Sequence, residues 1–259
     1  MREDEIPIET PDKNQKLWRY MDFSKYVDLL TTSELHFGRA DKFEDPYDSS
    51  PMQFLVDAYK QLPPVPPEGK EWTRKVNTFG RLFVYLNCWH ISDDPSAALW
   101  KLYSENKYET IAIQTIFSKL KSETETKWPR DGIVITKVKY DPENAGKPIE
   151  NIPGGRLFTV LGWENIIYKR KSFAYEKELR AIIFQRGDKF KEVTLRNEAH
   201  FEKVKRERPP HIRIEINPSN LIERVYVSPL ATDWFVELVK NVSGELKDRV
   251  LKSDLYEIY

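Results

Sequence analysis

The residues most suited to chemistry are two glutamates separated by one position. Glu176 and Glu178 lie in the run 173–180, which reads FAYEKELR. If this run is extended, both carboxylates point to one face, because side chains in a strand repeat every two residues. They then repel each other, so one keeps a raised pKa or a cation lies between them. Such a pair can act as a general base or stabilise a cationic transition state, whereas in a helix both would be ordinary solvated charges.

An arginine stands among large apolar residues near the start of the chain. Arg19 lies in the run 17–20, which reads LWRY. Its guanidinium offers a rigid fork of donors that suits phosphate. Arg19 is therefore either a fixed anion binder or a surface charge on a half-buried strand, and the pattern leaves both interpretations open.

Aromatic residues gather further along the chain. The run 88–92 reads CWHIS, and Trp100 and Tyr103 follow it. Trp100 and Tyr103 lie three positions apart in an expected helix, so they would share one helix face. They are either core aromatics or a wall on which a flat ring, such as nicotinamide or a nucleobase, can stack.

The residues that commonly bind metals show no ligand spacing. The histidines are far apart in sequence: His36, His90, His200 and His211. The one cysteine, Cys88, excludes a disulfide framework and a cysteine-rich zinc site. The run 43–48, FEDPYD, favours a turn, although Asp45 and Asp48 could feed a hard metal ion. The chain is expected to work without a metal.

The chain is electrically balanced, with 41 basic and 41 acidic residues among 259. Binding to nucleic acid through bulk charge is therefore not expected. The basic segment from Lys189 to Arg208 also carries glutamates, which favours a solvated helix or loop over a nucleic-acid groove. Apolar runs are too short to span a membrane, and residues 1–10 have no signal-peptide core. We therefore expect a cytoplasmic protein without membrane contact.

Short strands and helices must position these residues. Periodicity predicts strands at 16–20, 35–38, 82–91, 110–114, 132–140, 211–216 and 224–228, and a strand end at 181–184. It predicts helices at 23–30, 52–62, 96–106, 116–125, 163–170 and 233–247. Strands and helices do not alternate regularly, and no glycine-rich nucleotide loop is present. The prediction is one α+β domain over 16–259, after a polar lead-in over 1–15.

Four motifs follow one another in a definite order. They are Arg19-Tyr20; Phe43-x-Asp45-Pro46-x-Asp48; Cys88-Trp89 with Trp100-x-x-Tyr103; and Lys171 with Phe173, Glu176, Glu178 and Arg180. Together they resemble a bacterial domain of unknown function, the family numbered 2971, over roughly residues 16–230. One departure is His90, which stands where the family usually has a serine, with Ser92 two positions further on.

A more distant similarity is to ADP-ribosyltransferases. It implies a split, mostly antiparallel sheet flanked by helices, and a cleft that binds NAD as a substrate. The expected cleft is lined by Arg19, Tyr20, Trp100, Tyr103, Glu176 and Glu178. By this similarity the arginine holds an NAD phosphate, an aromatic residue supports the nicotinamide, and Glu178 with Glu176 is the catalytic acidic position. A carboxylate there stabilises the oxocarbenium-like state that forms when the nicotinamide–ribose bond breaks.

Three functions are compatible with these predictions. The first is ADP-ribosyl transfer in a bacterial defence or toxin setting, to a protein, nucleic acid or small-molecule acceptor. The second is a metal-dependent nuclease or hydrolase that uses Asp45, Asp48, Glu176 and Glu178 around Mg²⁺. The third is a non-enzymatic module that senses or binds a ligand, whose function would survive Glu178→Gln. The balanced composition does not discriminate among them.

Overall fold

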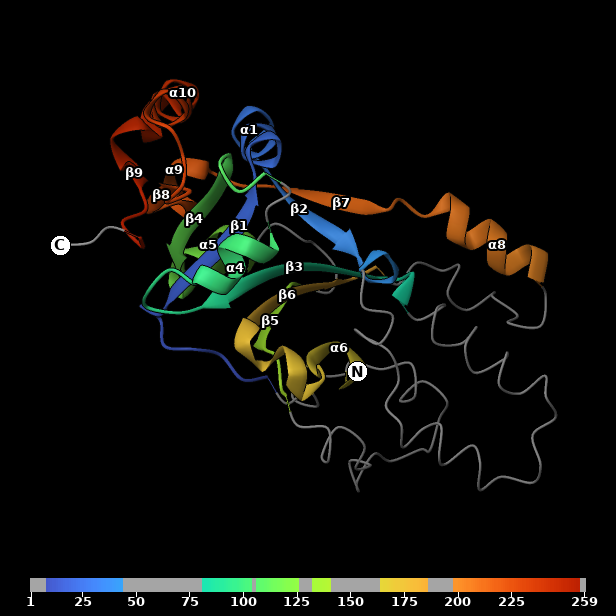
Figure 1. Ribbon diagram of the computed structural model, residues 1–259. Helices are drawn as coiled ribbons and strands as arrows, with labels where there is room; N and C mark the ends of the chain where they lie inside the picture. The colour runs from blue at the N-terminus through green and yellow to red at the C-terminus, as the bar shows by residue number, and fades with distance from the viewer. Residues whose placement is uncertain are drawn as a thin grey trace.

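A branched β-sheet with helices on its faces organises the chain (Figure 1). The computed structural model describes residues 8–43, 81–103, 106–125, 132–140, 164–185 and 198–256. Within them the strands are β1 (Lys16–Asp22), β2 (Glu34–Arg39), β3 (Val84–Ile91), β4 (Thr110–Ile116), β5 (Val134–Lys137), β6 (Glu178–Phe184), β7 (His211–Glu215), β8 (Arg224–Val227) and β9 (Val250–Lys252). The α-helices are α1 (Phe23–Thr32), α4 (Ala97–Leu102), α5 (Phe117–Glu125), α6 (Glu164–Ile167), α8 (Glu198–Glu207), α9 (Pro218–Leu221) and α10 (Asp233–Val242). The 3-10 helices are η2 (Ala40–Lys42), η3 (Lys171–Glu176) and η4 (Gly244–Arg249).

Strand pairing is mostly antiparallel, as predicted. The main path runs β5-β6-β3-β1-β4-β8-β9, and β2 with β7 forms a side branch from β3. Among the strands that the structure describes, the pairing of β8 with β9 is parallel and the other pairings are antiparallel. The architecture is therefore mixed α and β, with an open sheet flanked by helices.

The branch arises because β3 changes its partner along one edge. Near its end, β3 pairs with β1 through His90 opposite Trp18, and near its start it pairs with β2 through Leu86 opposite Gly38. Between these pairings β1 and β2 diverge, so residues 87–89 of β3 have no described strand partner on that edge. The other edge of β3 pairs with β6 along 84–90. We call the place where β1, β2 and β3 separate the fork.

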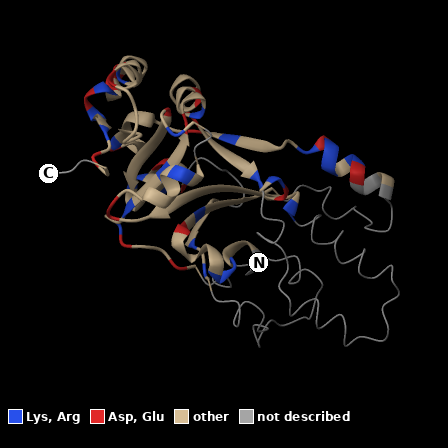
Figure 2. Cartoon of the chain, in the orientation of Figure 1, with Lys and Arg blue, Asp and Glu red and all other residues tan. Residues whose placement is uncertain are grey.

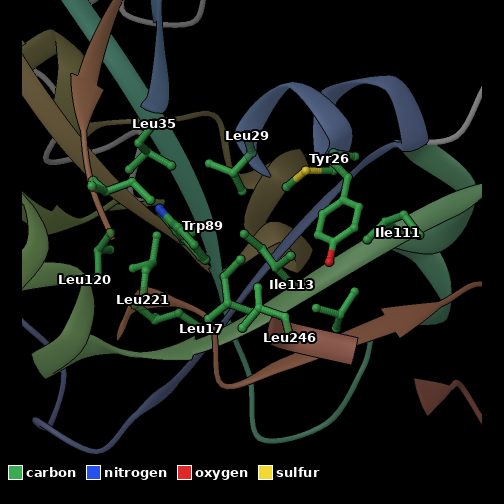
Figure 3. Close-up of a cluster of buried hydrophobic side chains, with 14 of the residues drawn as sticks. Leu17, Tyr26, Leu29, Leu35, Trp89, Ile111, Ile113, Leu120, Leu221 and Leu246 are labelled. Carbon is green, nitrogen blue, oxygen red and sulfur yellow. The ribbon is translucent and has the colours of Figure 1, made fainter. Parts of the chain in front are cut away.

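Side-chain alternation gives each strand two different faces. On one face, Leu17 and Met21 of β1 belong to the largest buried hydrophobic cluster, together with residues of α1, α9 and α10. Figure 3 shows part of this cluster, in which Leu29 of α1, Trp89 of β3 and Ile113 of β4 lie together. Burial of this apolar surface is what holds the helices onto the sheet.

The opposite face carries two smaller clusters. Trp18 and Tyr20 of β1 pack with Trp100 of α4, and Ile182 of β6 packs with Ile167 of α6. The segments α4 and α6 therefore cover different parts of this face. Glu178 and Arg180 share the face with Ile182, because they lie at even spacing along β6.

Two differences from the predicted elements affect the site. The helix expected over 96–106 ends at Leu102, and Tyr103 is its C-cap. Glu176 ends a 3-10 helix, and β6 begins at Glu178. The predicted helix at 52–62, the acidic positions of the run 43–48 and residues 189–197 lie outside the described residues. No helix in the described ranges is long and apolar enough to cross a membrane.

Candidate functional site

The fork opens into a cavity of about 920 Å³. This volume lies in the range of small-molecule sites. Its walls come from β1, α1, β2, β3, the end of α4, and the segment from 169 to 178. Both Arg19 and Glu178 line it, although strand alternation places them on opposite faces of the sheet. They share one hollow because the sheet is split between β1 and β3.

Arg19 provides a cation at one side of the cavity. Its guanidinium lies 6.0 Å from the centre of the Trp89 ring, and its Nη2 donates to the His36 carbonyl at 3.4 Å. No carboxylate among the described residues forms an ion pair with it. Burial lowers the pKa of Arg19 to about 10, so the side chain stays protonated at neutral pH. It therefore meets the requirement for an anion binder.

The His36 carbonyl shows how the fork is kept in place. In an unbroken sheet such a group would bond to the next strand. Here it accepts from Asn87 Nδ2 at 2.8 Å and from Arg19 at 3.4 Å. Asn87 Oδ1 in turn accepts from Trp89 Nε1. Side chains thus replace the backbone hydrogen bonds that the divergence of β1 and β2 removes.

Glu178 provides a fixed carboxylate that lines the same cavity as Arg19. Arg180 lies two residues along β6 on the same face. It donates two hydrogen bonds to Glu178, from Nε to Oε1 at 2.7 Å and from Nη2 to Oε2 at 3.0 Å. Burial alone would raise the pKa of Glu178. The charges of Arg180 and Lys169 outweigh that effect and lower the pKa to about 2. Glu178 is therefore ionised at any physiological pH.

Lys169 joins the two glutamates. Its Nζ lies 2.5 Å from Glu176 Oε2 and 3.3 Å from Glu178 Oε2, and 5.0 Å from the centre of the Phe173 ring. This is the cation expected between two convergent carboxylates. Burial raises the pKa of Glu176, although Lys169 opposes the shift. The pair therefore has one firmly ionised member and one that takes up a proton more readily.

The backbone around the pair is held by its neighbours. Lys177, between the two glutamates, has the left-handed conformation with φ of 40°. Its carbonyl accepts from the Ile91 N–H at 2.9 Å, and His90 Nδ1 donates to the Glu176 carbonyl at 2.5 Å. The Glu178 N–H donates to the Tyr140 hydroxyl at 2.8 Å. A non-glycine residue is tolerated at this φ because these contacts fix the turn.

The third side of the cavity is formed by β2 and α1. His36 stacks on His211 of β7 with ring centres 4.4 Å apart. Burial, followed by the charges of His211, Arg19 and Arg213, lowers the pKa of His36 to about 4. Arg213 differs from Arg19 because Asp28 and Glu34 neutralise it, at 3.2 and 3.4 Å.

The structure brings five of the six predicted cleft residues to this cavity: Arg19, Tyr20, Tyr103, Glu176 and Glu178. Tyr20 is buried, its hydroxyl accepts from the Ser96 N–H at 2.7 Å, and burial raises its pKa to about 12. Tyr103 is 48% exposed at the mouth. Trp100 is the exception: it is 4% exposed, lies edge-on to Tyr20 at 5.0 Å, and does not line the cavity. The expectation that Trp100 offers a ring platform is not met, because α4 turns it into the core.

Three features of the site were not predicted from the sequence: Lys169, Arg180 as the partner of Glu178, and the pair of His36 with His211. The spacing of Arg180 from Glu178 was a usable signal, because residues two apart share a face of a strand. Lys169 gave no signal, since it follows α6 and reaches the glutamates only after the chain turns back through η3.

The described residues contain no group of three or more histidine, cysteine or acidic side chains that could hold a metal ion. Both oxygens of Glu178 and Oε2 of Glu176 accept hydrogen bonds from Lys169 or Arg180. Asp45 and Asp48, which the metal-dependent hypothesis also needs, lie outside the described residues.

Comparison with known proteins adds no homologue to this picture. No protein-family model matched the chain, and searches of curated proteins and of solved structures also found no match. The chemistry of the cavity is therefore the basis on which a function can be proposed.

Proposed function

We propose that the cavity binds NAD as a substrate and that the chain transfers its ADP-ribose group to an acceptor. One observation carries the proposal: a guanidinium that forms no ion pair with a carboxylate of the described residues, and a largely buried carboxylate pair, line the same hollow. The first suits the pyrophosphate of a dinucleotide, and the second suits a sugar that develops positive charge. The resemblance to ADP-ribosyltransferases predicts the same two groups.

Each residue has a distinct role in this proposal. Arg19 holds the pyrophosphate, and Tyr103 at the mouth supports the nicotinamide ring. Glu178 stays ionised and accepts hydrogen bonds from the ribose hydroxyls, which strengthen as the oxocarbenium forms. Glu176, with its raised pKa, is the better proton acceptor.

The transfer balances without a further reactant. The bond from ribose C1′ to the nicotinamide nitrogen breaks, and its electron pair goes to the ring, which leaves as neutral nicotinamide. A lone pair on the acceptor then forms a new bond to C1′. The proton that the acceptor loses passes to Glu176 and on to water.

Thermal unfolding with and without NAD tests the binding half. A ligand at a hundred times its Kd stabilises by about 2.7 kcal/mol, which is about 5–10 °C for a chain of this size. We expect Arg19→Ala to lose the NAD-induced shift. Arg224→Ala, which removes an exposed arginine outside the cavity, should retain it. If millimolar NAD leaves the wild-type midpoint unchanged, the proposal fails.

Release of nicotinamide from NAD tests the catalytic half. Glu178→Gln and Glu176→Gln should each lower the rate by at least about tenfold, while the NAD-induced thermal shift persists. Binding with no nicotinamide release in the wild type, in the presence of candidate acceptors, would instead identify a non-enzymatic NAD-binding module.

A further inference from the structure

We propose that the mouth of the cavity binds a single-stranded nucleic acid. This inference rests on the proposed function, because the strand would be the acceptor of the ADP-ribose group. The surface concerned is called the rim. Its members that line the cavity are Leu102, Tyr103, Arg170 and Tyr175. The exposed lysines next to them in the chain complete it: Lys101, Lys171 and Lys177.

Exposed aromatic rings are the first feature of the rim. Tyr103 and Tyr175 line the cavity, yet they are 48% and 45% exposed. In the proposed function Tyr103 supports the nicotinamide ring, so Tyr175 is the exposed ring at the mouth that is left for a second flat partner. Unpaired bases stack on aromatic side chains, whatever their sequence, because every base has a flat π-face. Phe173 differs, because Lys169 and Arg170 lie over its ring at 5.0 and 5.1 Å.

Positive charge is the second feature. The cations Lys101, Arg170, Lys171 and Lys177 are all exposed. Of these, Lys101, Lys171 and Lys177 form no ion pair with any described carboxylate. The acidic residue of the rim segment, Glu176, is bound to Lys169. A locally basic rim on an otherwise neutral chain favours a polyanion as its partner.

The helix α8 makes an instructive contrast. It is the described part of the basic segment from Lys189 to Arg208, and Figure 2 shows both signs of charge along it. Lys203 pairs with Glu207 at 3.8 Å, and Lys205 with Glu202 at 3.7 Å. Its lysines are therefore largely compensated within the helix, whereas those of the rim are not.

The position of the rim favours single strands over a duplex. A base that stacks on Tyr175 lies beside Glu176, which lines the same cavity. Bases in a duplex are stacked and paired, so they cannot reach such a site without being extruded. In the transfer, a ring or exocyclic nitrogen of the base would supply the lone pair that bonds to ribose C1′. Nicotinamide leaves with its bonding pair, and the proton goes to Glu176.

Fluorescence anisotropy with labelled oligonucleotides of about ten bases tests the inference without NAD. Single-stranded DNA, single-stranded RNA and a DNA duplex are compared at several salt concentrations. Four phosphate contacts predict a slope of log K against log salt of about −3, since each contributes about 0.7. The double variant Lys171→Ala with Lys177→Gly should reduce this slope by about 1.4. Tyr175→Ala should weaken binding about tenfold. Glycine is used at 177 because the backbone there has a positive φ.

The matched control removes two lysines from α8, as Lys203→Ala with Lys205→Ala, and should change binding little. Preference for DNA or for RNA identifies the sugar, and either supports the inference. The inference is overturned if the control loses as much affinity as the rim variants or if the duplex binds more tightly than the single strands. It is also overturned if neither single strand shows salt-dependent binding. Because NAD binding is measured separately, an intact NAD shift without strand binding refutes this inference alone. Strand binding without an NAD shift refutes the proposed function instead.

Discussion

Replacing Lys169 with methionine tests whether the carboxylate pair depends on one cation. Methionine keeps a long unbranched side chain but removes the charge that lies 2.5 Å from Glu176 and 3.3 Å from Glu178. The side chains of Lys169 and Glu176 are 9% and 11% exposed, so the carboxylate left behind stays largely out of water. Breaking a buried ion pair by removing one partner costs about 3–5 kcal/mol. We expect about 3 kcal/mol, because Glu178 keeps both bonds to Arg180.

Urea unfolding measures this loss, and thermal unfolding should show a midpoint lower by about 6–12 °C. A second variant separates charge from packing. In a Glu176→Gln background, Lys169→Met no longer strands a carboxylate and should cost about 1 kcal/mol. The coupling energy between the two positions is then about 2 kcal/mol.

The loss of stability in Lys169→Met should also depend on pH, and its direction follows from the pKa values of the two glutamates. The pKa of Glu178 lies at about 2 against an ordinary 4.5, so its contribution to stability is present above 4.5 and is lost as pH falls towards 2. Lys169 supplies part of that contribution. Without Lys169, burial raises the pKa of Glu176 further, and protonation relieves the variant as pH falls. The difference in the free energy of unfolding between wild type and variant should therefore narrow as pH falls through the raised pKa of Glu176. If Lys169→Met lowers the free energy of unfolding by the same amount at pH 7 and pH 4, with either Glu or Gln at position 176, the reasoning is refuted and lost packing is the cause.

Two further outcomes are expected. Burial, followed by the charges of His211 and Arg19, lowers the pKa of His36 to about 4, so the free energy of unfolding should fall as pH drops from 6.5 to 4. Urea unfolding of His36→Gln should show a smaller change in that free energy over the same pH range. A profile identical to wild type would contradict this. Ser33 is the C-cap of α1, with φ of 55° and its N–H donating to the Leu29 carbonyl. Glycine adopts this left-handed conformation without strain, so Ser33→Gly should stabilise the folded protein by about 0.5–1 kcal/mol. A lower thermal midpoint in the variant would contradict this.

Local pattern was enough to place two of the strands that line the cavity, whereas β6 was predicted only as a strand end at 181–184 and η3 was not predicted. Aromatic residues around Arg19 marked β1, and the β-prone run from 82 to 91 marked β3. The structure has both strands close to the predicted bounds. The two glutamates were singled out because carboxylates one position apart must either repel or share a cation, and they share Lys169.

Local pattern failed where the outcome depended on the end of an element. The helix expected through 106 ends at Leu102. Trp100 is 4% exposed in the core, whereas Tyr103 is 48% exposed and lines the cavity. A spacing of three along the chain does not indicate which of two residues at a helix end is covered by other elements.

The sequence by itself determined which side chains lie on which face of each strand, because that depends on a period of two. The register of β1 with β3 and of β3 with β6 then puts Glu178 on the face of Trp18, and therefore Arg19 on the opposite face. Only the tertiary structure decided that they share a cavity, because β3 exchanges β1 for β2 along one edge and the sheet opens there. Strand partners are chosen by contacts between residues far apart in sequence, and the period of a single strand carries no information about them.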